Sequence, residues 1–213
     1  MLAAAQRRTG HRARAPNRSA CDTAFVTDWP AWATETVELR PPDPAWQQDG
    51  ERERQALEAA LAPWLMARVE HVGSTAVPGL AAKPILDLQA AVVDLRATPD
   101  IAETLAPASW HYVSPDLDLR PWRRFFVKVS GGRRIAHLHV MERNSARWGE
   151  QLAFRNALLA HPHLVETYAA LKRDLASQNT ADREAYTAAK SDFVRAVLER
   201  NARDDSTGGC GAP

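Results

Sequence analysis

Long apolar runs are missing from this chain of 213 residues, and cysteine is almost absent from it. A transmembrane helix needs about 20 consecutive apolar residues, so the sequence predicts no membrane partner. The two cysteines, Cys21 and Cys210, stand near opposite ends of the chain and form neither a zinc motif nor a redox motif. Because unpaired cysteines are typical of reducing compartments, we expect a cytoplasmic location.

A strong net charge is also missing, although the charge is unevenly distributed. The formal net charge is +1, yet residues 1–20 contain five arginines and no acidic residue. The remaining sequence is therefore net acidic, which argues against nucleic acid as a partner. The first residues lack the apolar segment of a secretory signal. An Arg-rich start is also found in organelle transit peptides, but we favour a disordered extension over residues 1–34.

Composition and length indicate one globular domain over residues 35–202, followed by a disordered tail over residues 203–213. The pattern of apolar residues predicts strands in the middle of this domain and helices at its end. The expected strands are 37–40, 68–72, 85–93, 125–129 and 135–141, and the expected helices are 46–62, 99–106, 145–160, 163–178 and 182–201. This order predicts an α+β fold with a mixed or antiparallel sheet, flanking helices and a C-terminal helical bundle.

The segment 71–89 is the most informative part of the sequence. Val72-Gly73-Ser74 follows a predicted strand, and a Gly-Ser turn that opens a helix presents backbone N–H groups to a phosphate. Asp87 lies on the next predicted strand, where its carboxylate could hold the divalent ion that accompanies such a phosphate. Gly73 and Ser74 are therefore candidate phosphate-binding residues, and Asp87 is a candidate catalytic residue and metal ligand.

His137 and His139 share one face of their predicted strand, because side chains alternate along a strand with a period of two. With Asp87 they could form a metal site that suits Zn²⁺, Mn²⁺ or Fe²⁺ better than Mg²⁺, or they could contact phosphate. The alternative is that one histidine lies in the core and the other on the surface. The cofactor is thus predicted to be a divalent ion, either Mg²⁺ or a transition metal.

Basic residues near these strands are further candidates. Lys83 lies between the turn and Asp87, within reach of a phosphate. Arg124 and Lys128 are predicted to share a strand face that suits a polyanion, and Lys128 is the second candidate catalytic residue. The alternative is ordinary solvated surface charge, which is the only role that we assign to Arg123.

The C-terminal helices contribute the remaining candidates. Arg155 is predicted at the edge of buried surface. Tyr168 and Lys172 are four residues apart, as are Tyr186 and Lys190, so each pair shares a helix face. These faces could line a cleft and bind a nucleotide, with Arg155, Tyr168, Lys172 and Lys190 among the contacts. The alternative is that each lysine stem simply covers its tyrosine ring.

Taken in order, these motifs resemble those of the GrpB family, a branch of the nucleotidyltransferase superfamily. The resemblance runs from Val37 to about Arg200 and includes segments 37–46, 71–89, 123–128, 137–140, 152–155, 161–162, 168–172 and 186–190. It implies a nucleotidyltransferase-like fold. The superfamily pattern places a second acid two residues after Asp87, and this chain has Gln89 there.

The resemblance implies a protein that binds a nucleoside triphosphate with a divalent ion and transfers a nucleotidyl group to an unknown small-molecule acceptor. A first alternative is a non-catalytic nucleotide- or anion-binding module that assists folding, as in similar domains fused to dephospho-CoA kinase, which implies a protein partner. The chain has no Gly-x-x-x-x-Gly-Lys-Ser/Thr motif, so it carries no kinase of that kind. A second alternative is a metal-dependent hydrolase or ligase that uses the two histidines.

Overall fold

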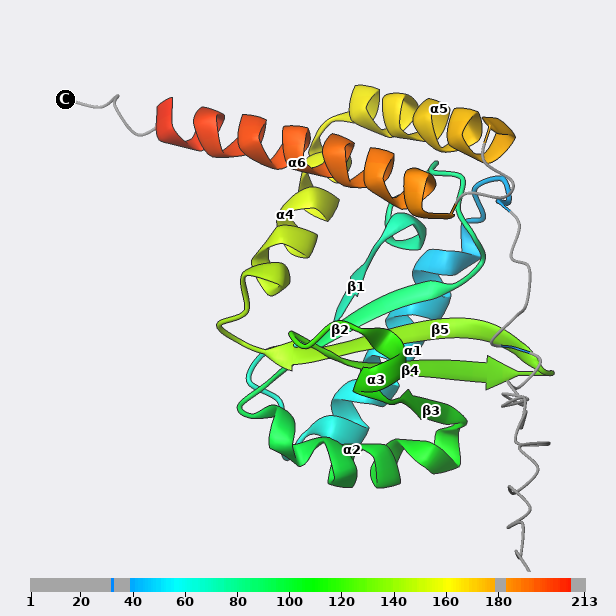
Figure 1. The fold of residues 1–213 in the computed structure, drawn as a ribbon, viewed down its shortest axis with the longest axis vertical. Helices are drawn as coiled ribbons and strands as arrows, with labels where there is room; N and C mark the ends of the chain where they lie inside the picture. Colours follow the sequence, from blue (N-terminus) through cyan, green and yellow to red (C-terminus); the bar gives the residue numbers. More distant parts are fainter. Residues whose placement is uncertain (1–31, 33–38, 179–182, 208–213) are drawn as a thin grey trace, which may run out of the picture.

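A five-stranded mixed sheet forms the centre of the molecule (Figure 1). A computed structural model describes residues 32, 39–178 and 183–207. The strands are β1 (Glu70–Val72), β2 (Leu86–Val92), β3 (Trp110–Val113), β4 (Arg124–Ser130) and β5 (Arg133–Glu142), in the spatial order β1-β2-β5-β4-β3. β2 and β5 run parallel, and the other neighbouring strands are antiparallel.

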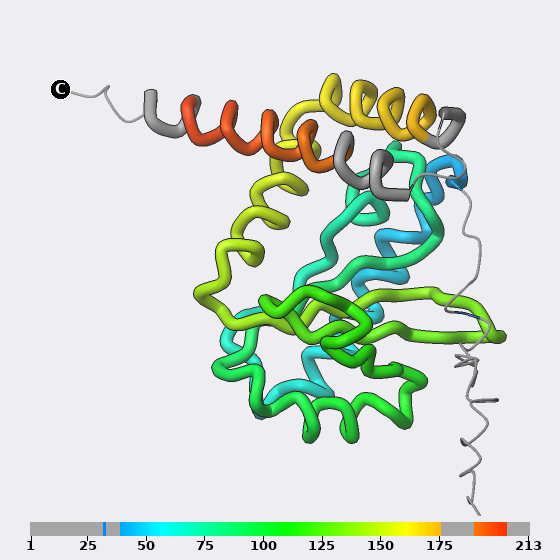
Figure 2. The backbone as a smooth tube through the Cα atoms, in the orientation of Figure 1, coloured from blue at the N-terminus to red at the C-terminus, as the bar shows by residue number. Residues whose placement is uncertain are grey.

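Helices cover both faces of this sheet. α1 (Ala45–Leu61) and α2 (Thr98–Leu105) pack on one face and enclose the main apolar core with it. α4 (Ala146–Ala160), α5 (Pro162–Gln178) and α6 (Arg183–Thr207) contact one another and form the C-terminal helical bundle on the other side (Figure 1). Figure 2 shows the chain rising from the end of β5 through α4 to α5 and α6.

The alternation of side chains along the strands separates an apolar face from a polar one. Leu88, Phe126 and Leu138 are fully buried in the core beneath α1 and α2. Their neighbours in sequence point to the opposite face, since successive residues of a strand alternate. The parallel pairing of β2 and β5 sets Asp87 beside His137, so the candidate residues of two distant segments meet on the polar face.

The turn between β4 and β5 fixes the register of this hairpin. Gly131 and Gly132 both have positive φ, of 56° and 74°, a conformation that glycine adopts with little steric cost and that suits a two-residue hairpin turn. A β-bulge between Lys128 and Val129 then shifts the pairing, so that Phe125 lies opposite His139 and Val127 lies opposite His137.

The predicted α+β fold, with its mixed sheet and C-terminal helical bundle, is confirmed. The sequence did not predict β3, or the short helix α3 (Pro115–Asp118) that joins β3 to β4. Of the predicted strand 37–40, only the last two residues are described, and Arg40 forms an isolated bridge with Ala82.

The ends of the domain differ slightly from the prediction. α6 continues to Thr207, beyond the predicted boundary at 202. Apart from Trp32, the predicted extension 1–34 lies outside the described residues, as do residues 208–213 of the predicted tail. Within the described ranges, no helix combines the length and apolar character needed to cross a membrane.

Candidate functional site

A tight turn after β1 brings the backbone against the Asp87 carboxylate. Gly73 has a φ of 71° and leads into the 3₁₀ helix η2 (Ser74–Ala76). A Cβ atom at position 73 would lie 2.5 Å from Asp87 Oδ2. Glycine is therefore required both for the backbone conformation and for this close approach. The structure places Gly73, Ser74 and Asp87 together, in the arrangement that the sequence predicts.

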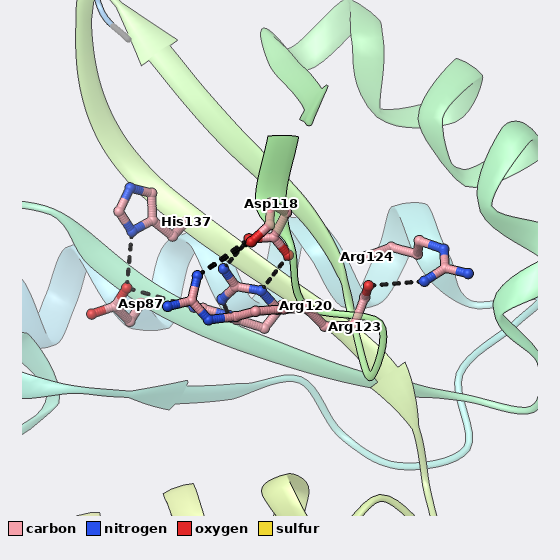
Figure 3. A network of polar contacts seen from close by, with 7 residues as sticks. Asp87, Asp118, Arg120, Arg123, Arg124 and His137 are labelled. Atoms are coloured by element: carbon pink, nitrogen blue, oxygen red, sulfur yellow. Dashed lines mark hydrogen bonds and ion pairs between the residues drawn. The ribbon is translucent and has the colours of Figure 1, made fainter. Parts of the chain in front are cut away.

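Two histidines of β5 surround one oxygen of this carboxylate. His137 Nδ1 lies 3.1 Å from Asp87 Oδ1 (Figure 3). His139 Nε2 lies 3.7 Å from the same oxygen. Burial works to raise the pKa of Asp87, but the interactions with His137 and His139 outweigh it and lower the pKa below its ordinary value. Asp87 is therefore an ionised carboxylate at neutral pH.

His139 is held from its other side by Arg123. The guanidinium Nη1 contacts His139 Nδ1, and its Nε donates to Asp118 Oδ2 at 2.8 Å (Figure 3). Burial lowers the pKa of His139, although the Asp87 carboxylate works to raise it. Arg123 is 7% exposed, so the interpretation of Arg123 as solvated surface charge is wrong. Because Arg123 precedes the first residue of β4, strand alternation could not place its side chain.

Three lysines from different parts of the chain meet beside Asp87. Lys83 from the loop before β2, Lys172 from α5 and Lys190 from α6 line a pocket of about 130 Å³ together with Ser74, Asp87 and His137. Three lysines against one carboxylate give this pocket an excess of basic side chains. The structure thus brings together all three lysines that the sequence analysis proposed as phosphate contacts.

Lys172 is the most enclosed of these cations. Its side chain is 2% exposed, and its Nζ donates to Ser74 Oγ at 3.1 Å and to the Ala81 carbonyl oxygen. Burial, reinforced by repulsion from Lys190, lowers the pKa of Lys172 to about 7. Burial also lowers the pKa of Lys190, while Asp87 works against this shift. The pocket therefore holds cations that an anionic ligand would stabilise in their charged form.

A larger cleft of about 690 Å³ opens beside this pocket and shares Ser74, Asp87 and Lys190 with it. It lies between the polar face of the sheet and helices α4 and α6. Its other walls include both polar and apolar side chains, among them Trp122, His139, Gln151, Phe154 and Tyr168. This volume falls within the range that binds small organic ligands.

Two proposed site residues lie on the wrong face of the sheet. Lys128 Nζ donates to both carboxylate oxygens of Glu53 on α1, at 2.6 and 2.8 Å. The Arg124 guanidinium donates to the carbonyl oxygens of Pro121 and Arg123 and lines a separate hollow of about 510 Å³. Both residues do share one strand face, as the sequence predicts, but that face packs on α1 and α2. Their assignment to the Asp87 site is therefore corrected.

Arg155 and Tyr168 have mainly structural contacts. Arg155 Nη1 donates to Glu70 Oε2 at 2.7 Å and to the His71 carbonyl oxygen at 2.9 Å, so it ties α4 to β1. The Tyr168 ring stacks on Phe193, lines the cleft, and lies 4.8 Å from Lys172 Nζ. The lysine thus covers the tyrosine ring and also reaches the pocket. The side chain of Tyr186 lies outside the described residues.

The sequence analysis assigned no side-chain role to His71, which supports the Gly-Ser turn. Its Nε2 lies 2.9 Å from Thr75 Oγ1, and burial lowers the pKa of His71 to about 4. A Cβ atom on Gly50 of α1 would lie 2.2 Å from the His71 ring. Gly50 therefore leaves room for a neutral histidine behind the turn. The one feature of the sequence that could have indicated this contact is Gly50 itself, a glycine inside the predicted helix 46–62.

Asp87 is the candidate ligand for a divalent ion in this site. Within residues 39–178 and 183–207, no three His, Cys, Asp or Glu side chains are arranged to bind a metal ion. Gln89 is fully buried, and its Nε2 donates to the Trp148 carbonyl oxygen at 3.3 Å, so it offers only a neutral amide oxygen. Asp87 alone suits one Mg²⁺ shared with phosphate oxygens, because Mg²⁺ sites commonly combine one or two carboxylates with substrate phosphates.

The polar face of this mixed sheet thus combines a Gly-Ser turn, a strand aspartate and an adjoining lysine pocket. The sequence profile described as GrpB protein matches residues 36–200, so this chain belongs to the GrpB family.

Individual relatives agree with this assignment. UPF0157 protein PA4798 from Pseudomonas aeruginosa is 37% identical, over 81% of this chain and 70% of that protein. The crystal structure of GrpB from Enterococcus faecalis superimposes with a TM-score of 0.68 at 29% identity, covering 77% of this chain and 99% of that one. A dephospho-CoA kinase from Mycolicibacterium paratuberculosis is 31% identical over 81% of this chain, but this chain spans only 48% of the kinase.

Proposed function

We propose that this protein binds a nucleoside triphosphate in the cleft and transfers its nucleotidyl group to a small-molecule acceptor. The observation that carries the proposal is the convergence of Lys83, Lys172 and Lys190 on the turn and carboxylate formed by Ser74 and Asp87. Lysines that converge in a small pocket repel one another, and a bound polyanion would offset this repulsion. The adjoining cleft has the size that a nucleoside needs.

The lysine pocket and the larger cleft would bind different parts of the proposed ligand. The lysine pocket takes the phosphates, with Ser74 as a hydrogen-bond donor, and the larger cleft takes the sugar and base. Asp87 would hold one divalent ion, which when bound would neutralise negative charge on the phosphates. Fixed charges of this kind stabilise phosphoryl transfer mainly through positioning and electrostatics.

The transfer itself needs an acceptor with a nucleophilic hydroxyl. Its oxygen forms a bond to the α-phosphorus while the bond from that phosphorus to the pyrophosphate oxygen breaks. Pyrophosphate leaves, and the hydroxyl proton passes to water. A single carboxylate would hold one divalent ion for this displacement, whereas two-metal enzymes hold two.

Ligand-dependent unfolding tests the proposal directly. The protein is heated with ATP, GTP, CTP or UTP in the presence of Mg²⁺, and the same series is measured for Asp87→Ala. A ligand at 100 times its dissociation constant stabilises the folded state by about 2.7 kcal/mol. We expect a nucleotide- and Mg²⁺-dependent shift that Asp87→Ala removes. Equal melting temperatures under all conditions would reject the proposal.

A non-catalytic nucleotide-binding module is the second candidate, and Gln89 is the observation that favours it. The neutral amide of Gln89 stands two residues after Asp87, where the superfamily has an acid. The similarity to part of a dephospho-CoA kinase is consistent with a domain that serves another enzyme. Release of pyrophosphate in the presence of mixed sugar, amine and polyol acceptors separates the two candidates, since a binding module would bind the nucleotide without consuming it.

A further inference from the structure

Arg123 connects a surface loop to the centre of the site. Its guanidinium spans from the carboxylate of Asp118, at the end of α3, to the ring of His139 on β5. It also lies over the Phe125 ring, with 4.2 Å between its Cζ atom and the ring centroid. The side chains of Arg123 and Asp118 are only 8% and 5% exposed, so this pair holds a fixed position.

The chemistry of arginine determines which nitrogen of His139 carries a proton. A guanidinium only donates hydrogen bonds, so His139 Nδ1 accepts from Arg123 through its lone pair. A neutral imidazole has one lone pair and one N–H, so the hydrogen is on Nε2. That nitrogen lies 3.7 Å from Asp87 Oδ1, and its N–H is directed toward the carboxylate.

We propose that Arg123 is a positioning residue that holds His139 with its Nε2–H toward Asp87, and that this arrangement leaves His139 no lone pair with which to bind a transition metal. The tautomer of His139 does not depend on the proposed nucleotide function. The binding of Mg²⁺ together with a triphosphate does rest on that function.

A metal-binding imidazole must offer a free lone pair, and His139 has none to offer. His137 and His139 both approach Asp87 Oδ1, whereas Oδ2 faces the turn at Gly73. Oδ2 is therefore the carboxylate oxygen left for a hard ion. Burial favours the neutral form of His139 by lowering its pKa, in agreement with a single N–H.

Arginine suits this role better than lysine does. Its planar guanidinium binds both carboxylate oxygens of Asp118 through Nε and Nη2 and still presents Nη1 to His139. Such paired hydrogen bonds fix the plane of the guanidinium. A lysine would supply a charge on a flexible stem, without a fixed direction for the N–H that meets His139.

The first test measures the tautomer in the unmodified protein. Long-range ¹H–¹⁵N correlation spectra at neutral pH distinguish the two neutral forms of a histidine ring from the cation, and a His139→Gln spectrum assigns the signal. We expect His139 as the Nε2–H tautomer. An Nδ1–H tautomer or a doubly protonated ring would overturn the proposal, and this outcome does not depend on any variant folding.

The second test uses Co²⁺ alone as a probe, because its visible absorption reports ligation by histidine nitrogen. The full-length protein should show no cobalt spectrum that depends on His139. Arg123→Met combined with Asp118→Asn frees His139 Nδ1 without leaving a buried acid unpaired, and it should bind Co²⁺ at least tenfold more tightly. Arg124→Met is the matched control, since it removes the same charge one residue away and outside the site.

Each result of the cobalt experiment has a defined meaning. A cobalt spectrum in the unmodified protein that disappears in His139→Gln would overturn the proposal. So would a folded Arg123→Met/Asp118→Asn protein without increased Co²⁺ affinity. If the Nε2–H tautomer and the cobalt gain are observed but no nucleotide binds, then the proposed function fails while the role of Arg123 stands.

Discussion

The two faces of the central sheet are made by the same strands, yet one face is an apolar core and the other is a polar site. Beneath α1 and α2, Leu88, Phe126 and Leu138 are completely buried. On the opposite face, residues adjacent in sequence to these, among them Asp87 and His139, border a cleft under α4 and α6. A change of one position along a strand thus separates a residue that stabilises the fold from one that can bind a ligand.

This comparison explains why the candidate site contains so many charged groups. The apolar face supplies the free energy of folding, so the other face can hold a carboxylate, two histidines and nearby lysines. Buried charges reduce stability unless they are paired. The polar face therefore contributes less to the free energy of folding than the apolar face does. A bound anion would offset the repulsion among its lysines.

The largest difference between the two faces should appear in stability. Leu138→Ala removes buried methyl groups and leaves a cavity, so it should lower the free energy of unfolding by about 3 kcal/mol. His137→Gln, one residue away on the polar face and partly exposed, should lower it by less than half as much. Urea denaturation of both variants measures these values. An equal loss of unfolding free energy in both variants would mean that the polar face stabilises the fold as much as the apolar face does.

Ligand affinity should depend on side chains of the polar face more than on those of the apolar face. Lys190→Met removes one of the three cations of the pocket, so it should weaken the binding of inorganic tripolyphosphate about tenfold, which corresponds to about 1.4 kcal/mol. Isothermal titration calorimetry at fixed salt measures the change. Arg203→Met on the same helix removes an equal charge outside the pocket and should change the affinity less than twofold. A similar loss in both variants would show that only the overall charge matters.

Much of this arrangement follows from local patterns in the sequence. The period-two strands and the Gly-Ser turn predicted the sheet and the meeting of Asp87 with His137 and His139. Strand alternation also predicted that Arg124 and Lys128 share a face, but not which face α1 would cover. That choice depends on the packing of a distant helix, and it moved both residues away from the site.

Other features depend on contacts that leave no local pattern. Arg123 stands just before β4, and its partner Asp118 lies in α3, a helix that the sequence did not predict. The pair forms only because α3 folds back toward β5. β3 was missed because it is a short edge strand in which only Trp110 is buried, so it lacks the alternation that identifies a half-buried strand.

The pH dependence of stability should also distinguish the two faces. The pKa of Lys172 is about 7 in the folded protein against 10.5 for a free lysine. Between these values the unfolded chain holds more protons, so stability should rise with pH in this window, by at most about 1.4 kcal/mol per pH unit. Below about pH 7 both states are protonated, and the contribution of Lys172 is constant.

Comparison with Lys172→Met isolates this contribution, because other groups titrate in the same range. The free energy of unfolding, measured by urea denaturation from pH 6 to pH 10, should rise less steeply in the variant than in the unmodified protein. Leu138→Ala, which alters the apolar face, should lower the whole curve without changing its slope. Parallel curves for Lys172→Met would show that the buried ammonium has an ordinary pKa.

The smallest effect is expected for Lys128, whose position on the α1 face removes it from the site. Lys128→Met breaks the ion pair with Glu53, whose side chains are 20% and 16% exposed. Pairs with access to solvent contribute about 0–1 kcal/mol, so stability should fall by no more than about 1 kcal/mol. Tripolyphosphate affinity should stay within twofold of the unmodified protein, whereas Lys83→Met, a change of the same kind inside the pocket, should weaken it about tenfold. A strong loss of affinity in Lys128→Met would place its ammonium on the polar face and so contradict the register that pairs Lys128 with Ala136.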